Sequence, residues 1–209
     1  MKLIRLLPLL GLFLLPGGTA LAGYEEGIEY ERLKVPVSTV DANKVELVEL
    51  FWYGCPHCYH LEPDMKKWLK NKPANVVFIR VPAVFRPIWG FHAKVYYTAE
   101  VLGVVEQVHD AMFNAMQVQR RKMATVEEVK ALFAEYGVSS EKFDNAFNSF
   151  AVDAKVRRAT DLTRRYGIEG VPALVINGKY VTDGVMAHGQ RGMLEVTDYL
   201  ISKESKSSK

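Results

Sequence analysis

The two cysteines of the chain, Cys55 and Cys58, lie where a strand pattern changes into a helix pattern. Residues 45–52 (VELVELFW) carry apolar side chains on both faces, which predicts a central strand covered on both sides. Pro56 suits the first turn of a helix, and apolar residues follow it at helical spacing. Residues 76–81 predict a second strand. We therefore expect a β-α-β unit with the cysteine pair at the start of its helix.

The remaining elements predict an α/β fold interrupted by helices. An extended edge segment precedes the β-α-β unit at 33–37, and a strand pair joined by Asn177-Gly178 and a final helix follow the helical region. Thr125 and Glu128 form a capping-box pattern inside that region. The expected divisions are a first α/β part at 23–84, an all-helical insertion at 85–162, a second α/β part at 163–203 and a disordered tail at 204–209.

Residues 1–22 have the pattern of a cleaved secretory signal. Lys2 and Arg5 precede an apolar run, and Ala20-Leu21-Ala22 resembles a cleavage site. Cleavage after Ala22 lowers the formal net charge from +3 to +1, which gives no support to nucleic-acid binding. The alternative is an N-terminal membrane anchor, although the run is short and broken by prolines. We expect an exported protein in a compartment that permits disulfides.

The Cys-Pro-His-Cys segment suits thiol chemistry. At a helix N-terminus, free backbone N–H groups and the helix dipole stabilise a thiolate on Cys55. His57 can present an N–H or a positive charge to that sulfur, and Pro56 removes one competing donor. Cys58, one turn later, is expected to be more buried. Stabilising the thiolate stabilises the reduced pair and so makes its disulfide a stronger oxidant.

Three other uses of the cysteines compete with redox catalysis. A structural disulfide across so short a loop would stabilise the fold little. A zinc site could use both cysteines and His60, but no fourth ligand or second cysteine pair is visible. Covalent haem attachment needs a histidine directly after the second cysteine, where this chain has Tyr59. The pattern therefore favours redox catalysis, with no metal.

Two segments resemble the DsbA family of periplasmic thiol:disulfide oxidoreductases. They are residues 51–58 (FWYGCPHC) and 170–173 (GVPA), and the order of elements is similar over nearly all of 23–203. The resemblance implies a thioredoxin-like fold carrying an all-helical insertion. It also implies a periplasmic oxidase that gives its Cys55–Cys58 disulfide to exported proteins with reduced cysteines and is reoxidised by the quinone-linked membrane protein DsbB. We expect a monomer without a cofactor of its own.

The same resemblance extends to Val171 and Pro172. An X-Pro bond at the start of a strand can be cis or trans, and the sequence alone favours an ordinary trans proline at the strand edge. The resemblance implies a cis-proline loop beside the disulfide. There Pro172 has no N–H to compete for the sulfurs, and the Val171 backbone can bind an extended substrate chain.

Two glutamates are candidates for proton transfer. Glu49 is six residues before Cys55 and lies either buried beneath the site or in water at the end of the sheet. If it is buried, desolvation raises its pKa. The resemblance implies that it exchanges protons with Cys58. Glu62 is similar to a second acidic position of the family, but a solvated charge on the helix surface explains it equally well.

Other functions remain open for the sequence. A disulfide isomerase or reductase could use the same fold, and a chaperone-like binding protein could carry the pair as a structural disulfide. His60, His92 and His109 are expected at the surface or in packing, and His188 carries little weight.

Overall fold

A computed structural model of the chain describes residues 23–207. Residues 1–22, and with them the predicted secretory signal, lie outside the described part. Within residues 23–207, no helix is long and apolar enough to cross a membrane.

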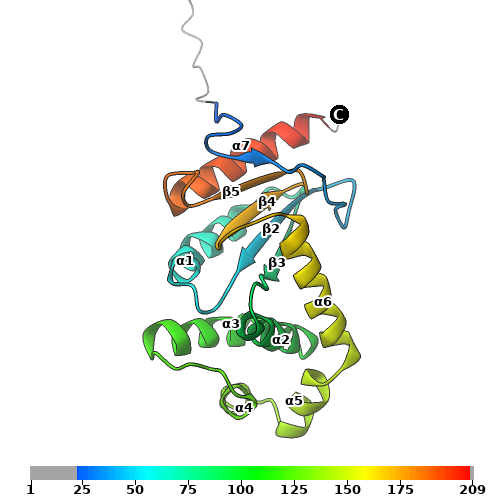
Figure 1. Cartoon of the computed structure of the whole chain (residues 1–209), viewed down its shortest axis with the longest axis vertical. Helices are drawn as coiled ribbons and strands as arrows, with labels where there is room; N and C mark the ends of the chain where they lie inside the picture. Colours follow the sequence, from blue (N-terminus) through cyan, green and yellow to red (C-terminus); the bar gives the residue numbers. More distant parts are fainter. Residues whose placement is uncertain (1–22, 208–209) are drawn as a thin grey trace, which may run out of the picture.

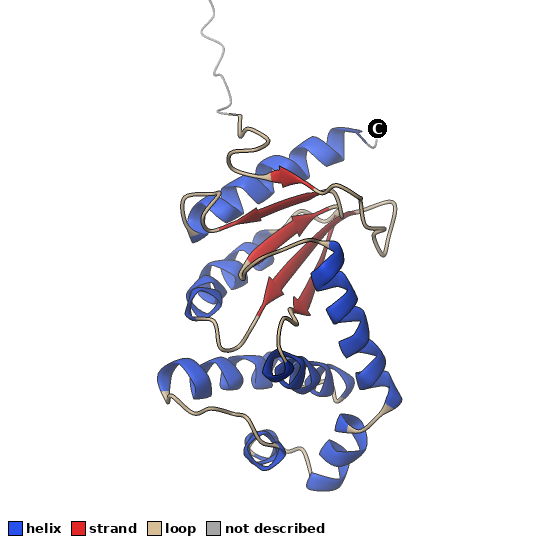
Figure 2. Cartoon of the chain, in the orientation of Figure 1, coloured by secondary structure: helices blue, strands red, loops and turns tan. Residues whose placement is uncertain are grey.

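The fold is built on a mixed five-stranded sheet in the order β1-β5-β4-β2-β3 (Figures 1 and 2). The central strand β2 is buried along its whole length, as its two apolar faces predict. It runs parallel to β3 and antiparallel to β4, and Glu49 lies opposite Arg80 in the parallel register. The strands are β1 Glu31–Arg32, β2 Val45–Phe51, β3 Val76–Pro82, β4 Ala173–Ile176 and β5 Tyr180–Asp183.

Helices α1 (Pro56–Asn71) and α7 (Gln190–Ser207) pack together beside the sheet. Leu61 and Met65 of α1 form one apolar cluster with Val196 of α7 and Leu47 of β2. Val48 and Leu50 of β2 belong to a second cluster, which continues into the helical region. Helix α1, which carries Cys58 in its first turn, is therefore anchored by apolar burial, and Pro63 lies within it without ending it.

The helical region forms a separate layer against the end of the sheet where β2 stops (Figure 1). Thr125 and Glu128 form the predicted capping box at the start of α4. Ser139 and Ser149 cap the two following helices with their hydroxyl groups. The elements are α2 Pro87–Val101, α3 Val105–Phe113, the π-helical turn η1 Asn114–Val118, α4 Val126–Ala134, α5 Ser140–Phe147 and α6 Phe150–Arg165.

The expected boundary between residues 162 and 163 falls inside α6. This helix packs along α2 within the insertion and returns to the sheet as one continuous element (Figure 1). Near the end of α6, the Thr163 hydroxyl accepts a hydrogen bond from the backbone N–H of Val84, the residue just before the insertion. The two ends of the insertion are thus tied together, and α6 belongs to both parts.

Two terminal predictions need correction. The regular edge strand is Glu31–Arg32 rather than 33–37, since Pro36 has no N–H to donate. The N–H groups of Leu33 and Val37 still bond to carbonyls of the β4–β5 turn. The disordered tail predicted from residue 204 is wrong for residues 204–207, because α7 continues to Ser207. The buried Glu204 carboxylate accepts hydrogen bonds from Asn177 and Lys179 there.

Candidate active site

Cys55 is the N-cap residue of α1. Its extended backbone (φ −92°, ψ 115°) ends the loop after β2, and Pro56 takes the first position of the helix. The backbone N–H of Cys58 points to the Cys55 sulfur at 3.4 Å. Both cysteines are buried and carry free thiols. The sequence prediction of a sulfur at a helix N-terminus is therefore confirmed.

The two thiols have opposite acidities. The pKa of Cys55 falls to about 6, chiefly because the Cys58 thiol donates a hydrogen bond to its sulfur, helped by backbone N–H groups and the charge of His57. Burial opposes this shift but is weaker. Burial raises the pKa of Cys58 well above its ordinary value, and the neighbouring Cys55 adds to the rise. The site therefore holds a ready nucleophile beside a thiol that retains its proton.

The loop before β4 closes over the cysteine pair. The Val171–Pro172 peptide bond is cis, as the family resemblance implies. The Cys55 sulfur lies 3.2 Å from the Val171 carbonyl oxygen, to which the thiol donates a hydrogen bond when it is protonated. Residues separated by more than a hundred positions in the chain thus meet at one sulfur.

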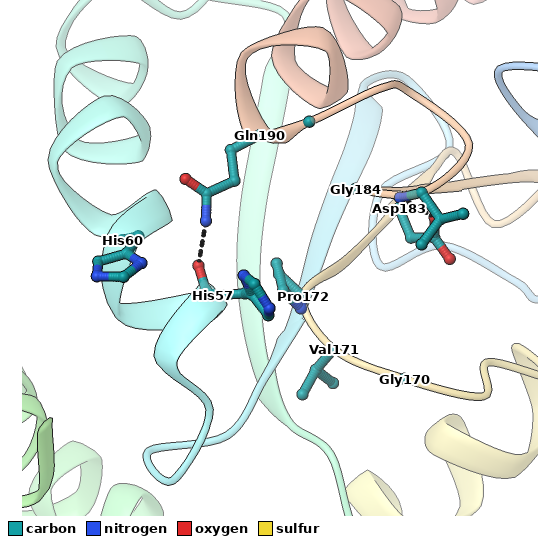
Figure 3. Close-up of a pocket in the computed structure, with 10 residues that line it drawn as sticks. His57, His60, Gly170, Val171, Pro172, Asp183, Gly184 and Gln190 are labelled. Carbon is teal, nitrogen blue, oxygen red and sulfur yellow. Dashed lines mark hydrogen bonds between the residues drawn. The ribbon is translucent and has the colours of Figure 1, made fainter.

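A cavity of about 510 Å³ lies beside this loop (Figure 3). Its walls come from the first turn of α1, the cis-proline loop and the segment between β5 and α7. Val185, which is 86% exposed, adds an apolar side chain to one wall. Gln190 ties α7 to α1, since its amide donates to the His57 carbonyl at 2.7 Å (Figure 3). The residues that line the cavity are His57, His60, Gly170, Val171, Pro172, Asp183, Gly184, Val185, Gly189 and Gln190.

Glu49 and Glu62 are both buried, on either side of Arg80. Arg80 Nε donates to Glu49 Oε2 at 2.8 Å, and its terminal nitrogen donates to Glu62 Oε2 at 3.0 Å. The possibility that Glu49 lies in water is therefore excluded, and Glu62 is not a solvated surface charge. Sequence reasoning did not single out Arg80, whose only signal is a basic residue within the apolar strand that follows α1.

Burial raises the pKa of both carboxyl groups, although the charge of Arg80 opposes the rise. The second oxygen of Glu49, Oε1, is buried without a hydrogen-bond partner. The charge of Glu49 also contributes to the raised pKa of Cys58. Electrostatically, this carboxyl group is thus coupled to the buried thiol of the redox pair.

The insertion holds the loop that precedes Cys55. The Trp52 ring stacks on Trp89 with a centroid distance of 4.1 Å, and its indole N–H donates to His92 Nδ1 at 2.9 Å. A Cβ atom on Gly54 would overlap the Trp52 ring, so glycine is needed there. His92 is buried, as a packing role predicts, but its hydrogen bond to Trp52 could not be read from sequence.

Within residues 23–207, no group of three or more His, Cys, Asp and Glu side chains is arranged to hold a metal ion. The zinc arrangement considered for the two cysteines and His60 is therefore not found in this part of the chain.

A stabilised thiolate paired with a protonated thiol is a chemistry of disulfide exchange, and here it occupies the strand–helix junction of a thioredoxin fold. These features define the class: a thiol:disulfide oxidoreductase of the thioredoxin fold, with Cys55–Cys58 as its redox pair. Residues 91–200 match the family described as DSBA-like thioredoxin domain, and the chain belongs to the DsbA family.

Curated relatives and solved structures agree over most of the chain. The thiol:disulfide interchange protein DsbA of Pseudomonas aeruginosa is 44% identical over 186 residues, which cover 89% of this chain and 88% of the relative. The protein of the same name from Azotobacter vinelandii is 42% identical, over 85% of this chain and 83% of the relative. The crystal structure of P. aeruginosa DsbA superposes with a TM-score of 0.85 at 43% identity and covers 88% of this chain and 96% of that one.

Proposed function

We propose that the chain is an oxidant, which passes its Cys55–Cys58 disulfide to exported proteins that still carry reduced cysteines. The observation that carries this proposal is the position of the Cys55 sulfur, which accepts the Cys58 N–H at the start of α1. A sulfur so placed is a good leaving group, and its thiolate stabilises the reduced pair. Both properties drive electrons from substrate thiols to the protein.

The reaction proceeds in two exchanges. A substrate thiolate attacks the Cys55 sulfur, the Cys55–Cys58 bond breaks, and Cys58 leaves as a thiolate that takes up a proton. A second substrate thiolate then attacks the substrate sulfur of the mixed disulfide, and Cys55 leaves as a thiolate. The substrate loses two electrons and gains a disulfide, and the protein gains two electrons as a dithiol. The pair itself carries these electrons, so no resident cofactor is proposed.

Side-chain roles follow from this scheme. His57 and Pro56 tune the Cys55 sulfur, and the Val171 backbone beside Pro172 binds an extended substrate segment as an added strand. The cavity lined by Val185 and the cis-proline loop offers an apolar surface next to the sulfur. Glu49 returns a proton to Cys58 as it leaves, and Glu62 supports Glu49 through Arg80.

A partner must reoxidise the dithiol after each cycle. We assign this step to a membrane-embedded, quinone-linked oxidase of the DsbB type, acting in the periplasm after removal of residues 1–22. Membranes containing such an oxidase should reoxidise the reduced protein only when quinone is present. One chain holds both cysteines and the whole cavity, which supports a monomer, and size-exclusion chromatography tests that state.

An oxidation assay tests the proposed direction of electron transfer, from substrate thiols to the protein. Oxidised protein mixed with a reduced two-cysteine peptide should give one peptide disulfide for each protein disulfide consumed, and Cys55→Ser should abolish the reaction. A protein that instead reshuffles scrambled disulfides only when it is reduced would be an isomerase or reductase on the same fold. Binding activity that survives Cys55→Ser, without peptide oxidation by the unmodified protein, would indicate a chaperone-like function.

A further inference from the structure

The insertion contacts Tyr53, two residues before Cys55, through both its backbone carbonyl and its side-chain hydroxyl. Gln117, in the π-helical turn η1, donates its amide N–H to the Tyr53 backbone carbonyl at 2.7 Å. The Tyr53 hydroxyl lies 3.1 Å from His109 Nδ1 on α3. Tyr53 and His109 are both buried, so neither group can exchange these partners for water. The active-site loop therefore takes its position partly from α3 and η1.

A neutral ring beside an ionised Glu62 determines the hydrogen-bond directions around His109. Burial and the nearby charge of Arg80 lower the pKa of His109 to about 3, so its ring is neutral and carries one N–H. His109 Nε2 lies 3.0 Å from Glu62 Oε1, an oxygen that Arg80 also contacts. With Glu62 ionised and the shared proton on Glu49, the Glu62 carboxylate only accepts, so Nε2 donates to Glu62 and Nδ1 accepts the hydroxyl proton of Tyr53.

A continuous buried chain of contacts leads from the active-site loop to Glu49. It runs from Tyr53 through His109 to Glu62, and from there through Arg80 to Glu49. Its members come from the active-site loop, α3, α1, β3 and β2. The chain ends at the unpartnered Oε1 of Glu49, whose charge acts on Cys58.

We propose that His109 is a positioning residue for the redox pair: by bonding Glu62 and Tyr53 at once, it fixes the Glu62–Arg80–Glu49 cluster relative to the active-site loop. This inference rests on the proposed role of Glu49 in proton transfer. His109 itself touches neither sulfur nor substrate. Its effect is on the step in which Cys58 leaves and takes up a proton.

Packing alone does not account for a histidine at this position. The ring lies edge-on to Phe51, Tyr96 and Phe113, at centroid distances of 5.0–6.0 Å, and a phenylalanine could make the same contacts. An aromatic residue without nitrogen would leave the Tyr53 hydroxyl without its acceptor and Glu62 with one donor fewer. Burying such unpaired groups costs free energy, so the two ring nitrogens of His109 are needed for these hydrogen bonds, which apolar packing cannot replace.

The charged surroundings must be considered together when a pH profile is measured. His109 and Glu49 act on each other electrostatically. The other titratable groups whose charges act on one or both of them are Arg80 on β3, Glu62 and Lys66 on α1, and Asp110 on α3. Tyr53, on the loop before α1, bonds His109 directly. Lys66 and Asp110 pair with each other near the surface.

The test compares three variants of the full chain. His109→Phe retains the ring and removes both hydrogen bonds, and His109→Gln retains an amide donor for Glu62. Tyr53→Phe removes only the hydroxyl. Thr125→Ala is the matched control, since it removes the cap of α4 and costs about 1 kcal/mol of stability without touching the chain of contacts. The rate of peptide oxidation is measured against pH and corrected for the substrate's own thiolate fraction.

We expect His109→Phe to slow peptide oxidation about tenfold and to flatten the limb of the pH profile that reports the proton returned to Cys58. His109→Gln should recover most of the rate, Tyr53→Phe should slow it about threefold, and Thr125→Ala should leave the corrected profile unchanged. Thermal unfolding of each variant separates stability from rate.

Two results would overturn the inference. One is a His109→Phe profile equal to that of Thr125→Ala, which would mean that the histidine serves stability alone. The second result applies if His109→Phe does not fold. It is a pH profile of Tyr53→Phe that is identical to the profile of the unmodified chain. Failure of the unmodified chain to oxidise the peptide would instead overturn the proposed function, so the two failures are distinguishable.

Discussion

Glu49 and Arg80 face each other across the parallel strands β2 and β3, and Arg80 Nε donates to Glu49 Oε2 at 2.8 Å. Glu62 contacts the same guanidinium from α1, so two buried carboxyl groups share one cation. If both were ionised, the cluster would carry an excess negative charge away from water. This imbalance favours protonation of one carboxyl group, and it places an exchangeable proton near the redox pair.

Replacing the shared cation should destabilise the fold strongly. Arg80→Met leaves two buried carboxylates without their partner, and we expect a loss of about 3–5 kcal/mol in the free energy of unfolding near neutral pH. The loss should shrink as the pH is lowered, because the raised pKa values of Glu49 and Glu62 let them take up protons in the folded state. Urea unfolding at pH 8 and pH 5 measures the difference.

Lys66→Met provides the control for this experiment. Its ion pair with Asp110 is exposed, so its removal should cost less than about 1 kcal/mol at either pH. An Arg80→Met penalty that is the same at pH 8 and pH 5 would contradict the shared-cation interpretation.

Replacing Glu49 by a side chain that cannot titrate should slow the step in which Cys58 leaves, with little effect on the reactivity of Cys55. Glu49→Gln retains an oxygen for Arg80 but cannot return a proton to the leaving Cys58 sulfur, and we expect peptide oxidation to slow about 10- to 100-fold. The rate at which Cys55 is alkylated in the reduced protein should change little. Glu46→Gln, a buried glutamate on the same strand, is the matched control. Equal rates for the two variants would remove Glu49 from the mechanism.

The sequence predicts the sulfur chemistry because the relevant contacts are local. Cys55, Pro56 and Cys58 interact through the geometry of one helical turn, so their roles follow from spacing. The cis-proline loop required the resemblance as well, since its contact with Cys55 is formed by the whole fold. The burial of Glu49 could be predicted only as one of two possibilities, because nothing local shows where a strand ends relative to its covering layers.

The glycine before Cys55 should be sensitive to the smallest substitution. Gly54→Ala places a methyl group into the Trp52 ring, which is held by Trp89 and His92, and we expect a loss of about 1–3 kcal/mol with a changed tryptophan fluorescence spectrum. Gly90→Ala on α2 is the control. Its Cβ meets only Val84 at 3.7 Å, so helix propensity should make it neutral or stabilising. Unchanged fluorescence in Gly54→Ala would argue against the Trp52 arrangement.

The stability of the reduced protein should depend on pH through Cys55. Its pKa is lowered from 9.0 to about 6 in the folded state, so ionisation favours folding. This contribution is fully present above pH 9 and is lost progressively as the pH falls through about 6. The difference in urea midpoint between the reduced protein and Cys55→Ala isolates it. A difference that stays constant between pH 9 and pH 5 would contradict the lowered pKa.

The parts that sequence could not supply are contacts between distant elements. Arg80 on β3 acquires its partners when β2, α1 and β3 come together. His109 and Gln117 acquire theirs only when the insertion packs against the end of the sheet. A histidine in a helix is usually a surface or packing residue, and His109 gives no local sign of its two hydrogen bonds. The sequence pattern places a boundary inside α6 for a related reason: this one unbroken helix belongs to both parts of the chain.

The central claim is that the Cys55–Cys58 disulfide is an oxidant, and its equilibrium with glutathione tests this most directly. In buffers of reduced and oxidised glutathione, the stabilised Cys55 thiolate should hold the protein largely as the dithiol even where oxidised glutathione is abundant. Alkylation of free thiols at equilibrium measures the fraction. A pair that is largely disulfide-bonded in buffers rich in reduced glutathione would be a reductant, and it would contradict the account.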